Sequence, residues 1–101
     1  MIIYNVTVKI DKDVHDDWYR WMKEEHIPEV MDTSFFVKNQ MCRLLSVDES
    51  DGITYAIQYY CNNERDLEKY HQTAAAELQK KHADRYKDKY VAFRTIMEVK
   101  E

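Results

Sequence analysis

Residues 2–10 read IIYNVTVKI and alternate between apolar and polar side chains. The apolar positions are Ile2, Tyr4, Val6, Val8 and Ile10, and the positions between them include Asn5, Thr7 and Lys9. A period of two residues is typical of a β-strand that has one face covered by other parts of the protein. The chain is therefore predicted to open with a half-buried strand.

Three later segments have the same strand character, at Phe35–Val47, Ile53–Cys61 and Tyr90–Val99. Two segments with helical spacing lie between them. The first has an apolar stripe of Val14, Trp18, Trp21, Met22 and Met31, a capping residue at Asp11 or Asp13, and Pro28 to end or kink it near Ile27. The second has a capping residue at Asn62 or Asn63 and buries Leu67, Tyr70, Ala74, Leu78 and Tyr86.

The resulting order, β-α-β-β-α-β, predicts an α+β protein with a ferredoxin-like fold. In that fold, a four-stranded antiparallel sheet in the order 4-1-3-2 carries both helices on one face. With one glycine and one proline, the chain has little material for irregular loops. We expect a single ferredoxin-like domain over residues 1–101.

Composition excludes several classes of protein. The chain has 101 residues with a net charge of −4, which disfavours nucleic acid and anionic membranes as partners. No apolar run approaches the roughly 20 residues that span a bilayer, and residues 1–6 do not resemble a signal peptide. A single glycine rules out glycine-rich phosphate loops. We expect a cytoplasmic protein.

The Asp51-Gly52 pair predicts a two-residue hairpin turn. This turn places Leu44 opposite Tyr59 and Cys42 opposite Cys61, and a longer turn is expected to preserve the faces. A disulfide between the two cysteines is then conceivable, although reduced thiols are expected in the cytoplasm. The helix-covered face is predicted to hold Tyr4, Val6, Val8, Cys42, Leu44, Tyr55, Ile57, Tyr59, Val91 and Phe93.

The opposite face is predicted to be mixed in polarity. It collects Ile3, Asn5, Thr7, Met41, Arg43, Leu45, Ala56, Gln58, Tyr60, Ala92, Arg94 and Ile96. Two copies stacked sheet on sheet through this face would form a homodimer, whereas a monomer would leave its apolar residues exposed. In the dimer, Asn5, Arg43, Gln58 and Arg94 would line a shared cavity that suits a carboxylate or phosphate. Alternatively, these side chains bond to the partner chain or to Glu98.

Three motifs carry a resemblance to a known family. Residues 1–8 (MIIYNVTV), 18–28 (WYRWMKEEHIP) and 89–95 (KYVAFRT) resemble the small bacterial domain-of-unknown-function family 4286, over essentially the whole chain. That resemblance supports the fold and implies no activity. A wider resemblance is to the dimeric α/β-barrel superfamily, some of whose enzymes have an aromatic residue followed by His-x-Pro, as at Trp21 and His26-Ile27-Pro28. It implies a pocket role for His26 alone.

His26 is the candidate catalytic residue. It lies beside Glu25 and Glu29, and a carboxylate there would orient it as a general base and raise its pKa. The alternative is a histidine that interacts with the last carbonyls of its helix. The pairs His15/His26 and His71/His82 are each eleven residues apart, too far along a helix to share a metal ion, so no metal site is predicted.

Aromatic side chains offer a second indication of a site. Trp18 and Trp21 lie on one helix face, where they either wall an aromatic pocket or pack in the core. The hydroxyls of Tyr55, Tyr59 and Tyr70 need partners if they are buried, which indicates a small polar cavity between the helices and the sheet.

Three hypotheses for function follow. The first is a non-enzymatic, cofactor-free homodimer that binds a small anionic or aromatic ligand. The second is a cofactor-independent oxygenase or isomerase with His26 as base and Asn5, Arg43 or Arg94 holding an anionic substrate. The third is a protein–protein interaction module that uses the mixed face.

Overall fold

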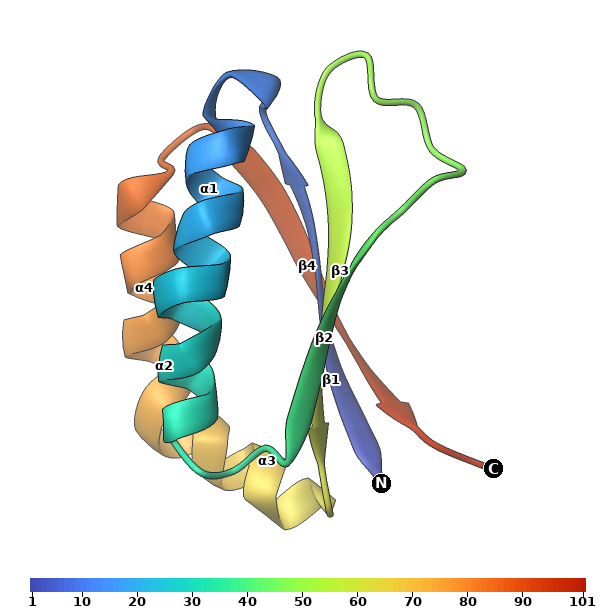
Figure 1. Cartoon of the computed structure of the whole chain (residues 1–101). Coiled ribbons are helices and arrows are strands. Elements are labelled where there is room, and N and C mark those ends of the chain that lie inside the picture. Colours follow the sequence, from blue (N-terminus) through green and yellow to red (C-terminus); the bar gives the residue numbers. More distant parts are fainter.

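The computed structural model describes residues 1–101 and has the predicted ferredoxin-like order of elements. The strands are β1 (Ile2–Ile10), β2 (Lys38–Arg43), β3 (Ile53–Cys61) and β4 (Tyr90–Glu98). They form one antiparallel sheet in the order β2-β3-β1-β4, which confirms the predicted order. All helices cover one face of the sheet and leave the other face bare (Figure 1).

Each of the two helical segments contains a π-helical turn. The first comprises a 3₁₀ turn (Lys12–Val14), α1 (His15–Trp21), a π-helical turn (Met22–His26) and α2 (Ile27–Asp32). The second comprises α3 (Glu64–Tyr70), a π-helical turn (His71–Ala75) and α4 (Ala76–Arg85). None of these helices has the length and apolarity that crossing a bilayer requires.

Of the two outcomes predicted at Pro28, an end or a kink near Ile27, the end does not occur, because the preceding turn widens. The amide of Ile27 bonds the carbonyl of Met22, five residues back. Pro28 then lies in the first turn of α2, where a missing N–H is tolerated. The segment continues to Asp32, and this π-helical turn carries His26.

The capping predictions have different outcomes at the two segments. The side chain of Asn63 accepts a hydrogen bond from the amide of Asp66 at 2.9 Å, which confirms the cap of α3. Asp11 makes no such bond, and Asp13 instead forms an ion pair with Lys89 at 2.8 Å.

The predicted two-residue hairpin is wrong. β2 ends at Arg43 and β3 begins at Ile53, so residues 44–52 form a long connection, which projects from the sheet in Figure 1. Gly52 has no positive φ and therefore forms no tight hairpin turn. Instead, Gly52 allows its backbone to pass close to that of β1, because a Cβ at this position would lie only 3.0 Å from the carbonyl oxygen of Ile10.

The register of β2 consequently differs from the prediction by an odd number of residues, which exchanges its faces. Arg43 lies opposite Tyr55 and Cys42 opposite Ala56. Arg43 therefore shares the helix-side face, and Cys42 the bare face. Cys61 lies opposite Ile2, and both cysteines are free thiols, so the predicted Cys42–Cys61 neighbours are not neighbours.

The faces of β4 are also opposite to the prediction. Arg94 lies opposite Val6, which places Arg94 on the helix side. Val91 and Phe93 lie on the bare face and are 67% and 63% exposed. β4 is an edge strand with apolar residues on both of its faces. Its sequence pattern therefore did not identify which face the helices cover.

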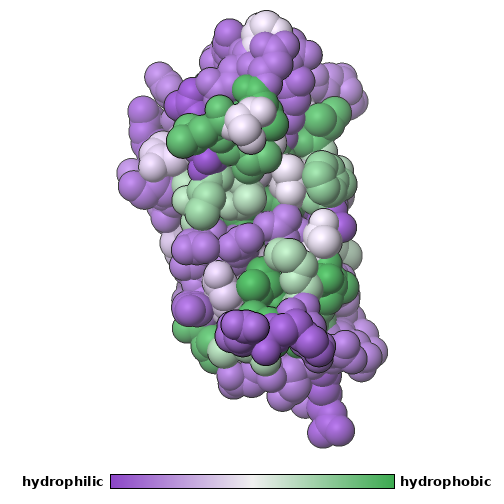
Figure 2. Space-filling view, turned by 90° about the vertical axis from the view of Figure 1, so that its right-hand side faces the viewer, coloured by the Kyte–Doolittle hydropathy of each residue, from purple (hydrophilic) through white to green (hydrophobic).

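Packing against the helices builds the core. Its most completely buried side chains come from both layers: Trp18, Ile10, Ile57, Val30 and Cys61. The bare face mixes apolar and polar surface, which Figure 2 shows as green and purple areas side by side.

Candidate functional site

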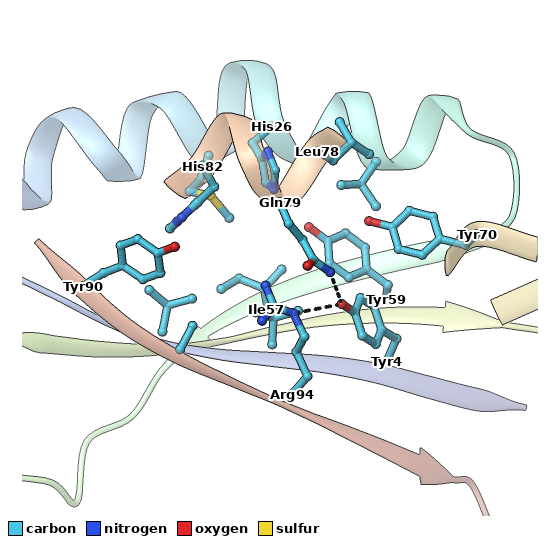
Figure 3. Close-up of a pocket in the computed structure, with 15 residues that line it drawn as sticks. Tyr4, His26, Ile57, Tyr59, Tyr70, Leu78, Gln79, His82, Tyr90 and Arg94 are labelled. Atoms are coloured by element: carbon cyan, nitrogen blue, oxygen red, sulfur yellow. Dashed lines mark hydrogen bonds between the residues drawn. The ribbon is translucent and has the colours of Figure 1, made fainter. Parts of the chain in front are cut away.

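A cavity lies between the helices and the sheet, as the tyrosine hydroxyls indicated (Figure 3). Tyr59 and Tyr70 line it, whereas the hydroxyl of Tyr55 lies outside it, 2.8 Å from Nε2 of His15. It encloses about 40 Å³ of free space, enough for a few water molecules. β1, β3 and β4 form its floor, and the π-helical turn of the first segment, α2, α3 and α4 form its walls. The lining residues are Tyr4, Val6, Val8, Met22, His26, Val30, Ile57, Tyr59, Tyr70, Leu78, Gln79, His82, Tyr90, Ala92 and Arg94.

His26 reaches this cavity from the π-helical turn Met22–His26. Its ring stacks on Trp21 with centroids 4.7 Å apart, and its Nδ1 is buried without a hydrogen-bond partner in the chain. Burial lowers the pKa of His26 to about 4, and the charges of Lys81 and Arg94 act in the same direction, against Glu29. The pKa is thus lowered, not raised as the sequence suggested, and His26 is neutral at pH 7.

Burial lowers the pKa of His26 by more than the charge of Glu29 raises it, and the Glu29 carboxylate is itself paired with a cation. Lys81 binds the Glu29 carboxylate at 2.7 Å. The alternative interpretation of His26, as a residue at the end of a helix, does not apply either, since the helical segment continues through α2.

His82 is the second histidine of the cavity, and sequence reasoning missed it. It lies on α4 and is buried, with its ring centroid 5.8 Å from that of His26. The indole Nε1 of Trp18 donates a hydrogen bond to Nε2 of His82 at 2.9 Å. Burial lowers the pKa of His82 to about 4, with smaller effects from His26 and Arg94 in the same direction.

Arg94 lies at the edge of the cavity and bridges it. Its Nε donates to the hydroxyl of Tyr4 at 3.1 Å, and Nε2 of Gln79 donates to the same hydroxyl at 3.5 Å (Figure 3). No carboxylate forms an ion pair with Arg94, in contrast to Arg43 and Arg85. These three side chains, Arg94, Tyr4 and Gln79, form a bridge from β4 across β1 to α4, which we call the Arg94 bridge.

The structure separates the four residues that the sequence grouped as ligand-binding. Arg94 joins His26 in the cavity. Asn5 and Gln58 lie opposite each other on the bare face. Arg43 binds Glu49 through Nε and a terminal nitrogen, at 2.9 and 2.6 Å, near the end of β2.

The cavity combines an apolar body with neutral polar groups and one positive charge. Its lining includes no aspartate or glutamate. Burial raises the pKa values of Tyr59 and Tyr70, so their hydroxyls stay protonated. No group of three histidine, cysteine, aspartate or glutamate side chains is arranged to hold a metal ion. Such a lining suits a small, mostly apolar molecule with an anionic group.

The family of the chain follows from comparison with family models. Residues 1–100 match a family described as Domain of unknown function (DUF4286). The chain belongs to the DUF4286 family. No curated protein matches this DUF4286 sequence at a significant level.

Solved structures resemble the DUF4286 chain over nearly its whole length. A dimeric ferredoxin-like protein from an uncultured marine organism has a TM-score of 0.68 and 6% identity, covering 100% of this chain and 96% of its own. MhuD with two manganese protoporphyrin IX molecules bound per active site has a TM-score of 0.70 and 9% identity, with the same coverage. SnoaB, a cofactor-independent oxygenase from Streptomyces nogalater, has a TM-score of 0.60 and 10% identity, covering 99% and 94%. At these identities the likeness establishes the ferredoxin-like fold alone.

Proposed function

We propose that this DUF4286 protein is a homodimer that binds a small, largely apolar or aromatic carboxylate in the cavity between helices and sheet. The observation that carries the proposal is Arg94, a cation at the edge of a carboxylate-free cavity whose Nε has a tyrosine hydroxyl as partner. A guanidinium binds a carboxylate more strongly than it binds a neutral hydroxyl. The ligand's anionic group would therefore replace Tyr4 as the partner of Arg94.

Ligand entry requires the Arg94 bridge to open. A cavity that holds a benzene ring has a volume of about 150 Å³, several times the present free space of about 40 Å³. Arg94 is exposed and Gln79 half-buried, so both side chains can swing outward without disturbing the core. Opening breaks two hydrogen bonds to Tyr4, and the charge-assisted bond from Arg94 to the ligand offsets that loss.

The carboxylate contact is tested with benzoate and its neutral counterpart benzamide, using chemical-shift perturbation of the cavity residues. Arg94→Gln is expected to weaken benzoate binding by about 10- to 100-fold, because it removes a hydrogen bond to a charged group. Benzamide binding should change little. Arg43→Gln is the matched control, since Arg43 is bound to Glu49 outside the cavity. Unchanged benzoate binding in Arg94→Gln, or shifts confined to other surfaces, contradicts the proposal.

A second candidate function is an enzyme of the oxygenase or isomerase type with His26 as base, by analogy with SnoaB. The observation in its favour is Nδ1 of His26, which is buried without a hydrogen-bond partner in a ring that is neutral above about pH 4. A base that abstracts a proton next to a carbonyl should accelerate exchange of the methylene protons of phenylpyruvate in D₂O. His26→Gln is expected to reduce the rate to that of buffer, whereas an unaccelerated rate in the wild type excludes this role.

The proposed homodimer forms through the bare face of the sheet, which includes the exposed side chains of Val91 and Phe93. A similar fold in a protein described as dimeric supports it. The proposal includes a cytoplasmic location, where the separate thiols of Cys42 and Cys61 would remain reduced.

A further inference from the structure

We propose that His82 positions the ligand by donating a hydrogen bond from its Nδ1 to a ligand oxygen, and that Trp18 fixes the tautomer that makes this possible. The inference rests on the proposed function and specifies its ligand further. In addition to the carboxylate at Arg94, the ligand would carry a carbonyl or oxyanion oxygen beside His82.

The tautomer follows from the chemistry of the two rings. An indole nitrogen can only donate a hydrogen bond, so Nε2 of His82 must accept the bond from Trp18 with a lone pair. Trp18 is fully buried and His82 is 8% exposed, so neither ring can turn to water instead. Because burial keeps the imidazole neutral at pH 7, its single proton lies on Nδ1.

His82 lines the cavity, and its Nδ1–H group has no acceptor within the chain. No hydrogen bond within the chain uses this atom, and only Nδ1 of His26 is fully enclosed without a partner, so Nδ1 of His82 borders free space. The aromatic rings of Trp21, Tyr86 and Tyr90 surround the imidazole, and the ring of Tyr90 is nearly perpendicular to it with the two centroids 4.4 Å apart. This packing holds the donor in a constant direction, which is what a positioning group requires.

The other polar groups of the cavity agree with an acceptor-bearing ligand. Arg94 and Gln79 both present donors, and no carboxylate of the lining is available to receive an ammonium group. A cationic ligand would meet the charge of Arg94 and the N–H of His82 together. A metal ion at Nδ1 is disfavoured because the proton would have to move to Nε2, against the N–H of Trp18.

The tautomer is tested without any ligand by long-range ¹H–¹⁵N spectra of the histidine rings. We expect His82 to show a protonated Nδ1 and an unprotonated Nε2. Trp18→Phe keeps an aromatic ring and removes the donor, so the second tautomer should appear. A wild-type His82 that carries its proton on Nε2 overturns the inference.

The ligand contact is tested with two acids of nearly equal shape, 4-acetylbenzoate and 4-isopropylbenzoate, of which only the first has a second acceptor. The wild type is expected to bind 4-acetylbenzoate about five- to tenfold more tightly, as one hydrogen bond allows. His82→Phe and Trp18→Phe should reduce this ratio toward one, and because it is a ratio, a general loss of packing does not imitate the effect.

The outcomes separate this inference from the proposed function. Arg94→Gln should weaken both acids and leave their ratio unchanged. If the wild type binds both acids equally, or if His82→Phe keeps the ratio, the His82 contact is wrong while the carboxylate site stands. If the wild type binds neither acid, the proposed function fails and the ligand contact with it.

Discussion

Acidification from pH 7 to pH 4 is expected to destabilise the protein by several kcal/mol, through His26 and His82. Both rings are buried, and their pKa values in the folded protein are lowered to about 4 from an ordinary value of 6.5. In the unfolded chain they bind protons below pH 6.5, whereas in the folded protein they do so only near pH 4. Stability is therefore complete above pH 6.5 and falls as the pH drops toward 4, by about 3 kcal/mol for each histidine.

Urea unfolding at fixed protein concentration and several pH values measures this loss. His26→Gln should remove about half of the slope between pH 6.5 and 4, and His71→Gln, a replacement of an exposed histidine, should leave the slope unchanged. Carboxylates with lowered pKa values, such as Asp17 and Asp51, begin to lose their contribution only near pH 5, because their ordinary pKa is 3.8. The slope between pH 6.5 and 5 therefore reports the histidines. Equal stability at pH 7 and pH 5 would contradict the burial of the two rings.

The same two histidines show where sequence reasoning reaches its limit. The spacing of apolar residues predicted each element, because strand and helix periods are local properties. His26 was identified from its place before Pro28. His82 is 56 residues away on another helix, and only the packing of α4 beside the first helical segment brings the two rings together.

The sequence placed Arg43 and Arg94 on the wrong face of the sheet because face assignments depend on register. The pair Asp51-Gly52 resembles a hairpin turn, but Gly52 instead allows the backbone to pass close to the carbonyl oxygen of Ile10. The register between β2 and β3 therefore differs from the predicted one by an odd number of residues. This difference exchanges the faces of β2 and places Arg43 on the helix side. At β4, both faces carry apolar residues, so the pattern did not show that Arg94 lies over the cavity and Phe93 on the bare face. Local patterns determine that a strand exists, whereas the partner strand determines which way its side chains point.

Phe93→Asp is expected to dissociate the proposed homodimer, with a dimer Kd at least about 30-fold higher than that of the wild type. A large aromatic side chain buried in an interface can contribute about 2 kcal/mol or more, and Asp would place an unpaired charge there. Sedimentation velocity at micromolar concentration should show a dimer for the wild type and a monomer for the variant. Ile96→Asp is the matched control, because Ile96 is 58% exposed on the same strand but points to the helix side.

Some hydrogen-bonding groups of the bare face already have partners within the chain. Asn5 donates to Thr7 at 3.0 Å, and Gln40 donates to Gln58 at 2.9 Å, so covering the face does not cost these two bonds. Val91 and Phe93 supply the apolar area whose burial drives association. If the wild type sediments as a monomer, the homodimer is excluded, and the bare face is then available to bind a different protein. If Ile96→Asp dissociates the dimer while Phe93→Asp does not, the interface uses the edge of β4 instead of the bare face.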